Sequence, residues 1–218
     1  MVELLFPRRC VVCRSLGPEL CTACLRHLRR IPLPLCERCG APTAWPVLRC
    51  GECAGRRLSF ASARSAIVYD APARAFVRSW KERGLRGLTS IAAKVVIGAI
   101  ARPDAVALCA VPADPDRVLT RGEHPATALT RVLGEHWGLP VVAPIARSGT
   151  RPRQAGLALA ARRGNVRGAF VARTAAPASV CLVDDVYTTG ATVNAAAATL
   201  RRAGVRRVDV VSLARAVR

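Results

Sequence analysis

Residues 180–192 read Val-Cys-Leu-Val-Asp-Asp-Val-Tyr-Thr-Thr-Gly-Ala-Thr. The four apolar residues at 180–183 predict a short buried strand of a parallel sheet. Two carboxylates, Asp184 and Asp185, follow at once, and a loop of hydroxyl residues and glycine comes next. Residues 193–203 are rich in helix formers and predict a helix. This order of strand, acidic pair, small-residue loop and helix is typical of an anion-binding site.

The loop after the acidic pair has the features of a phosphate site. The N-terminus of the following helix offers unpaired N–H groups and the positive end of a dipole. Gly190 lets the backbone approach a phosphate closely, and the hydroxyls of Thr188, Thr189 and Thr192 can donate to its oxygens. The two carboxylates would repel a phosphate, but they can accept hydrogen bonds from vicinal hydroxyls. We therefore expect the ligand to be a ribose that carries a 5-phosphate.

The same stretch resembles the phosphoribosyl pyrophosphate (PRPP) signature of type I phosphoribosyltransferases. That signature is a hydrophobic run, two acidic residues and a Thr-Thr-Gly-x-Thr loop, and the match is complete. The alternative is an ordinary polar strand-to-helix turn, but the ordered combination favours a site. The resemblance implies that Asp184 and Asp185 are the catalytic residues. It also implies that PRPP is bound by Val186, Tyr187, Thr188, Thr189, Gly190, Ala191 and Thr192.

Cysteine dominates residues 1–60, where eight of the ten cysteines form four Cys-x-x-Cys knuckles. Eight thiolates make two tetrahedral sites, which is the closed arrangement of structural zinc. Disulfides and redox pairs are the alternatives, but an intracellular chain disfavours the first and the fourfold repeat disfavours the second. The expected zinc ligands are Cys10, Cys13, Cys21, Cys24, Cys36, Cys39, Cys50 and Cys53.

We expect the first four cysteines to share one zinc ion and the last four another, although an interleaved cross-brace is also possible. His27 lies three residues after Cys24 and could replace a thiolate, but we interpret it as a surface residue. The module at 1–60 has few apolar residues, so metal binding must supply much of its folding energy. It could contact nucleic acid or protein, or it could pack as a clamp on the larger domain at 61–218.

The larger domain reads as alternating strands and helices, which indicates a parallel α/β sheet with its ligand at the carboxyl ends of the strands. Strands are expected at 65–69, 105–111, 139–145, 169–171 and 206–214. Helices are expected at 72–82, 89–101 and within 122–137, in addition to 193–203.

Candidate cations for a pyrophosphate group lie in three places. Lys81 ends a predicted helix and faces either the phosphates or solvent. The loop after the strand at 105–111 usually takes the pyrophosphate in this fold, and there Ala113, Arg117 and Arg121 are the candidate residues. Residues 151–170 hold five arginines before a short apolar run. This cluster is a solvated loop, a loop that closes over phosphates or a subunit contact.

The charge is strongly basic, with 34 Lys and Arg against 14 Asp and Glu and a formal net charge of +20. Such an excess favours a polyanionic partner. Aromatic residues are only 4% of the chain, so platforms for base stacking are few. No apolar run is long enough to span a bilayer, and residues 1–9 are too short and too charged for a secretory signal. We expect a cytoplasmic protein without membrane insertion.

The whole chain resembles the ComF family, competence-associated proteins with a phosphoribosyltransferase domain behind a double zinc ribbon. The motifs that carry the resemblance are the four knuckles, Val111-Pro112, Arg121-Gly122, Gln154-Ala155-Gly156-Leu157, Asn165-Val166-Arg167-Gly168-Ala169-Phe170 and the PRPP loop. The resemblance implies two structural Zn²⁺ ions, PRPP bound with Mg²⁺, and proteins of the DNA-uptake machinery as possible partners.

Two functions remain open at this point. The first is an enzyme that transfers the 5-phosphoribosyl group of PRPP and releases pyrophosphate. The second is a competence-associated protein that binds single-stranded DNA through its basic surface, with PRPP as a ligand or regulator. The second would bind mainly to phosphates, so its binding should weaken steeply with salt.

Overall fold

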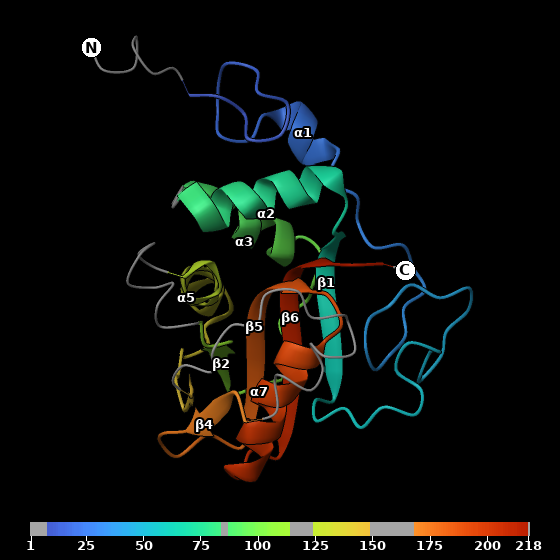
Figure 1. Ribbon diagram of the computed structural model, residues 1–218, viewed down its shortest axis with the longest axis vertical. Helices are drawn as coiled ribbons and strands as arrows, with labels where there is room; N and C mark the ends of the chain where they lie inside the picture. The colour runs from blue at the N-terminus through green and yellow to red at the C-terminus, as the bar shows by residue number, and fades with distance from the viewer. Residues whose placement is uncertain (1–7, 84–86, 114–123, 149–167, 218) are drawn as a thin grey trace.

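Four parallel strands form the central sheet, in the order β1-β6-β5-β2 (Figure 1). The computed structural model describes residues 8–83, 87–113, 124–148 and 168–217. The strands are β1 (Ser62–Val68), β2 (Ala107–Ala110), β5 (Ser179–Tyr187) and β6 (Arg207–Arg215). The two inner strands are β6 and β5, which carry long apolar runs because both of their faces are covered.

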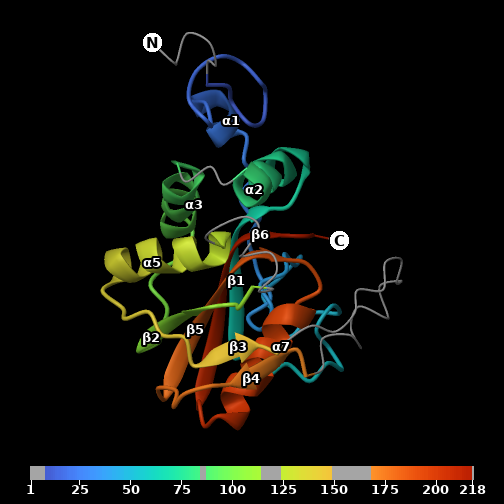
Figure 2. The same cartoon turned by 60° about the vertical axis from the view of Figure 1, so that its left-hand side comes forward.

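Helices cover both faces of this sheet, as Figure 2 shows from the side. On one face lie α2 (Ala71–Arg83), α3 (Gly87–Ile97) and α5 (Pro125–Trp137), and on the other lies α7 (Ala191–Arg202). A short antiparallel pair, β3 (Ile145–Arg147) and β4 (Phe170–Ala172), lies beside α7. The N-terminal module contributes one short helix, α1 (Thr22–Arg26). None of the helices within the described ranges is long and apolar enough to cross a membrane.

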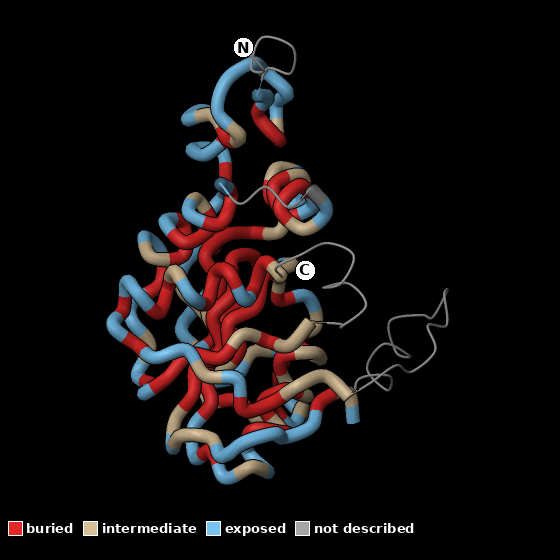
Figure 3. Tube along the Cα trace, turned by 90° about the vertical axis from the view of Figure 1, so that its left-hand side faces the viewer, coloured by how far each residue is buried: buried red, intermediate tan, exposed pale blue. Residues whose placement is uncertain are grey.

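The N-terminal module divides between two hydrophobic cores. Its first knuckles bury Cys10, Val11 and Leu20 in the core that contains α2 and α3. Its second pair of knuckles buries Cys36 and Cys53 in the core that contains α7. Figure 3 shows the buried centre of the molecule and, above it, the N-terminal segment, in which buried stretches alternate with exposed ones. The two halves of the module therefore support opposite faces of the sheet.

Most predicted elements are confirmed, with shifted ends. The strand predicted at 180–183 is longer than expected, because β5 continues through Tyr187 and therefore contains both aspartates. The strand predicted at 139–145 is wrong: Val141 makes only an isolated bridge with Leu108, and β3 begins at Ile145. Pro140 and Pro144 explain the difference, since proline has no N–H to donate to a ladder.

The helix predicted within 122–137 begins at Pro125, where proline is favoured because the first turn needs no N–H donor. It ends at Gly138, whose φ of 63° gives the left-handed cap of a helix C-terminus. The candidate cations Arg117 and Arg121 lie outside the described residues, as do residues 151–167 of the arginine cluster.

Candidate functional site

A cavity of about 330 Å³ lies at the carboxyl ends of β1, β2 and β5. This is where ligands bind in open parallel α/β sheets. Side chains from both the sheet and the helices converge on it. Its lining residues are Tyr69, Lys81, Val111, Pro112, Ala113, His124, Arg147, Asp184, Asp185, Val186, Thr188 and Thr192.

The acidic pair lies at the buried end of this cavity. Asp184 and Asp185 are 8% and 5% exposed, respectively. The carboxylate of Asp184 accepts a hydrogen bond from the N–H of Asp185 at 2.9 Å. The carboxylate of Asp185 accepts one from the N–H of Val186 at 2.6 Å. Lys81 reaches from α2 to form an ion pair with Asp185. The pair is thus held in place by its own strand and by one cation from a neighbouring helix.

Burial raises the pKa of Asp184 to about 7, while the positive charges of Lys81 and Arg147 act in the opposite direction. Desolvation disfavours the ionised carboxylate, and the two cations offset only part of that cost. The shift places the ionisation of Asp184 close to neutral pH. A pKa displaced this far, in a cavity, is a feature that functional sites share with some structural ion-pair networks.

The loop between β5 and α7 turns sharply at Gly190. This residue has φ of 72°, and a Cβ added to it would overlap the hydroxyl of Tyr187. Only glycine meets both conditions without strain. The hydroxyl of Thr189 accepts a hydrogen bond from the N–H of Ala191 at 3.3 Å, so it caps the turn rather than lining the cavity.

The structure brings most of the predicted site residues together and separates a few. Seven of the predicted residues line the cavity: Lys81, Ala113, Asp184, Asp185, Val186, Thr188 and Thr192. Tyr187 instead lies beneath the loop and is 2% exposed. Ala191 lines a second cavity, which lies between α7 and the start of β4, together with Asn194 and Arg202.

Five lining residues were not among the predicted site residues: Tyr69, Val111, Pro112, His124 and Arg147. Arg147 comes from β3, and its guanidinium carbon lies 5.6 Å from the centre of the Phe170 ring. That placement depends on the pairing of β3 with β4, in which Arg147 faces Phe170. Since the two residues are far apart in sequence, only the tertiary structure reveals this cation.

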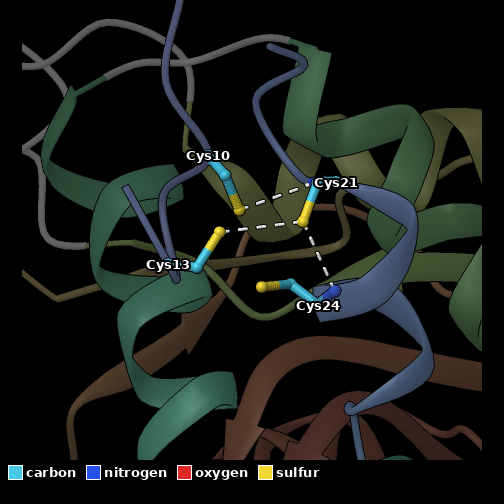
Figure 4. Close-up of side chains that lie close together, drawn as sticks. All are labelled: Cys10, Cys13, Cys21 and Cys24. Carbon is cyan, nitrogen blue, oxygen red and sulfur yellow. Dashed lines mark hydrogen bonds between the residues drawn. The ribbon is translucent and has the colours of Figure 1, made fainter. Parts of the chain in front are cut away.

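The eight knuckle cysteines form two groups of four in the sequential arrangement expected. Cys10, Cys13, Cys21 and Cys24 form the first (Figure 4), and Cys36, Cys39, Cys50 and Cys53 form the second. Within each group the sulfur atoms all lie within 4.8 Å of one another. His27 is exposed and belongs to neither group.

The sulfur separations fit zinc. Four sulfur atoms at about 2.3 Å from one tetrahedral zinc ion lie about 3.8 Å from each other. The separation is 3.7 Å for Cys13 and Cys21 in the first group. In the second group the three measured separations are 3.7, 3.5 and 3.9 Å. Backbone N–H groups point at Sγ of Cys10 and Cys36, as expected around thiolates.

Comparisons with known proteins agree with this organisation. Residues 1–54 match the double zinc ribbon domain. The chain is 28% identical over 227 residues to Competence protein F of Haemophilus influenzae, covering 97% of this chain and 98% of that protein. It is also 28% identical over 212 residues to DNA utilization protein YhgH of Salmonella typhimurium, covering 90% of each.

The chain is similar to both of these proteins along nearly its whole length. The resemblance to the ComF family that the motifs indicated is thereby confirmed. The fold class is also confirmed, as a parallel sheet flanked by helices behind a double zinc ribbon.

Solved structures of phosphoribosyltransferases are less similar in sequence to the chain than these two relatives are. Orotate phosphoribosyltransferase from Aeropyrum pernix matches at 17% identity and a TM-score of 0.37, covering 63% of this chain and 62% of that one. Adenine phosphoribosyltransferase from Thermoanaerobacter pseudethanolicus matches at 14% identity and a TM-score of 0.37, covering 61% and 83%.

Proposed function

We propose that the protein binds PRPP and transfers its 5-phosphoribosyl group to an acceptor, with release of pyrophosphate. One observation carries the proposal: the buried Asp184–Asp185 pair lines the same cavity as Thr188 and Thr192 of the loop that follows it. A ligand that satisfies both must present hydroxyl donors at one end and an anion at the other. A ribose 5-phosphate unit has this arrangement.

The phosphate end of the ligand is assigned to the start of α7. This helix has 12 residues, so its N-terminus provides free N–H groups and a positive dipole end. Thr188 and Thr192 line the cavity there and can donate their hydroxyl hydrogens. The ribose end is assigned to the ionised carboxylates, which accept hydrogen bonds from the 2- and 3-hydroxyls.

The pyrophosphate end is assigned to the cations that line the cavity. Lys81 and Arg147 are the described cations there, and Arg117 and Arg121 are further candidates from the sequence. Mg²⁺ bound with PRPP would supply additional charge neutralisation for the pyrophosphate oxygens. The resulting field lowers the energy of the charge that develops as pyrophosphate leaves.

The reaction is a displacement at C1 of the ribose. The lone pair of the acceptor forms the new bond to C1, while the C1–O bond breaks and pyrophosphate departs with that electron pair. The acceptor then loses its proton to solvent. Catalysis rests on orientation and on charge stabilisation, because both reactants are held in one cavity.

Calorimetry with PRPP and Mg²⁺ tests the proposal directly. Wild type should bind PRPP, and the double variant Asp184→Asn, Asp185→Asn should lose most of that affinity. Asp209→Asn is the matched control, because Asp209 is also 5% exposed but lies outside the cavity, paired with Arg207. Absence of PRPP binding by wild type would sink the proposal. Release of pyrophosphate with trial acceptors then distinguishes a transferase from a PRPP-binding protein.

A second candidate function is binding of single-stranded DNA, with PRPP as a ligand or regulator. The formal net charge of +20 favours it, and a relative at 28% identity is named a competence protein. The measurement is fluorescence anisotropy of a labelled oligonucleotide between about 50 and 200 mM salt, where phosphate-driven binding falls by orders of magnitude. Affinity that does not change with salt would contradict this second candidate.

A further inference from the structure

A buried arginine connects the second zinc site to the loop at 188–192 (the phosphate loop). Arg215, the last residue of β6, is 1% exposed. Its guanidinium donates to the carbonyl of Cys39 at 2.7 Å and to the carboxylate of Glu52, also at 2.7 Å. Cys39 is itself a zinc-site residue, and Glu52 lies between the two cysteines of the last knuckle. The guanidinium of Arg215 is therefore held by one backbone group and one side chain of the second zinc-site segment.

The same guanidinium supports Tyr187, which lies beneath the loop. The guanidinium carbon of Arg215 is 4.5 Å from the centre of the Tyr187 ring. The same ring makes an edge contact with Phe60, at 6.4 Å between centroids and 84° between planes. The Tyr187 hydroxyl fills the space next to Gly190, at the turn of the loop. The chain of contacts thus runs from the zinc site to the loop through Arg215 and Tyr187.

A second connection reaches the loop directly. Arg56 lies three residues after Cys53, and its guanidinium donates to the carbonyl of Thr189 at 2.9 Å. It also donates to the carbonyl of Glu52 at 3.4 Å. One side chain therefore hydrogen-bonds both the last knuckle and the turn of the loop.

A third connection anchors the first turns of α7. The side-chain oxygen of Asn194 accepts from the N–H of Ser59 at 2.7 Å, and its amide donates to the carbonyl of Arg57 at 3.3 Å. These backbone groups belong to the segment that leaves the second zinc site. The loop and the helix N-terminus, which together form the proposed phosphate site, are both held by this one segment.

The charge of the zinc site favours the same arrangement. Zinc with four thiolates carries a net charge of about −2, which offsets the buried positive charge of Arg215. Loss of the ion would free Cys39 and the last knuckle, and with them the partners of Arg215 and Arg56. The first zinc site differs, because it lies against α2 in the other core (Figure 1).

We propose that the second zinc site positions the phosphate loop, so that its occupancy sets the affinity for PRPP, with Arg215 and Arg56 as positioning residues. For the identity of the ligand this inference rests on the proposed function. The support of the loop is a separate claim, and hydrogen exchange of the backbone amides at 188–192 measures it without any ligand.

Cys50→Ser and Cys21→Ser form the decisive pair of variants. Both cysteines are half-buried, and each is the third cysteine of its group. Each variant should lose one zinc ion from the two expected. Cys50→Ser should speed exchange of the loop amides and weaken PRPP binding by clearly more than Cys21→Ser does. Equal effects of the two variants would overturn the proposal, as would unchanged exchange after zinc is lost from the second site.

Arg56→Gln tests the direct connection with both zinc sites intact. Loss of one hydrogen bond to the loop should weaken PRPP binding about three- to tenfold and raise loop exchange. Arg64→Gln is the control, because Arg64 is also half-buried and donates to the Glu37 and Ala63 carbonyls rather than to the loop. An identical result for both variants would contradict the role of Arg56.

The two measurements separate the two claims. If wild type does not bind PRPP, the proposed function fails, and hydrogen exchange alone still decides whether the second zinc site supports the loop. If wild type binds PRPP and Cys50→Ser binds it equally well, the inference fails while the proposed function stands.

Discussion

Lys81 of α2 forms an ion pair with Asp185 of β5 inside the proposed ligand cavity. The side chain of Lys81 is 36% exposed and that of Asp185 is 6% exposed, so the carboxylate depends on this cation more than the cation depends on it. The pair links α2 to the acidic end of β5. It also keeps a positive charge next to the position assigned to pyrophosphate.

Replacement of Lys81 by Met should affect both stability and binding. The buried carboxylate loses its partner, but solvent access to the site limits the loss of unfolding free energy to about 1 kcal/mol. PRPP affinity should fall further than stability does, because a cation near the pyrophosphate is removed. Urea unfolding and calorimetry measure the two effects. Lys94→Met is the control, since Lys94 is the only other lysine and is exposed on α3. Equal PRPP affinity in the two variants would contradict the prediction.

PRPP affinity should rise with pH through the pKa of Asp184. With a pKa of about 7, Asp184 is about one-tenth ionised near pH 6 and about nine-tenths ionised near pH 8. Only the ionised form accepts hydrogen bonds at both oxygens, so affinity should increase up to about tenfold over this range. Calorimetry at several pH values measures it. The 5-phosphate also titrates near pH 6, and Asp184→Asn should retain that component alone. Identical pH profiles for wild type and variant would count against the role of Asp184.

The same shift makes a prediction for stability. The pKa of Asp184 is higher in the folded protein than the ordinary value of 3.8. The folded state therefore binds more protons between these two values, and stability falls as pH rises from about 4 to about 7. Asp184→Asn removes this contribution, so wild type should lose more stability than the variant between those pH values. Urea midpoints at both ends of the range measure the difference.

Gly190→Ala should disrupt the loop for two separable reasons. A left-handed backbone costs an alanine about 1–2 kcal/mol, and the new Cβ would overlap the Tyr187 hydroxyl. Gly138→Ala is the matched control, because Gly138 has φ of 63° and open space around its Cβ position. Both variants should lose stability in thermal unfolding, but only Gly190→Ala should weaken PRPP binding. Adding Tyr187→Phe to Gly190→Ala should not restore the affinity, because ring carbon Cζ would still lie 2.5 Å from the new Cβ. Equal PRPP binding by Gly190→Ala and wild type would contradict the prediction.

The parts of the site that could be predicted are those contained in one continuous segment. Asp184, Asp185 and the loop at 188–192 lie on one continuous strand, turn and helix. Their order in the sequence is therefore enough to predict that they lie close together. The zinc sites are equally local, because each Cys-x-x-Cys spacing brings two sulfur atoms together. Features that depend only on neighbouring residues can therefore be predicted from the sequence.

The remaining features depend on pairings between distant segments. Arg147 reaches the cavity only because β3 pairs with β4. Arg215 meets the second zinc site because β6 lies between β1 and β5, with the ribbon beside its carboxyl end. The strand predicted at 139–145 does not form, although its apolar residues suit a strand. Its two prolines lack the N–H donors that a β-ladder needs. The spacing of residues in the sequence does not predict these tertiary contacts.

Removal of zinc should destabilise both faces of the sheet. Cys10 and Cys24 of the first site are buried in the core with α2 and α3, whereas Cys36 and Cys53 of the second are buried in the core with α7. The free energy of metal binding contributes directly to the folding of such modules. A chelator should therefore lower the unfolding temperature of the whole protein, not only that of the N-terminal module. Elemental analysis should give about two zinc ions per chain before treatment. A chelated protein that keeps its original unfolding temperature would show that the two cores do not depend on the metal.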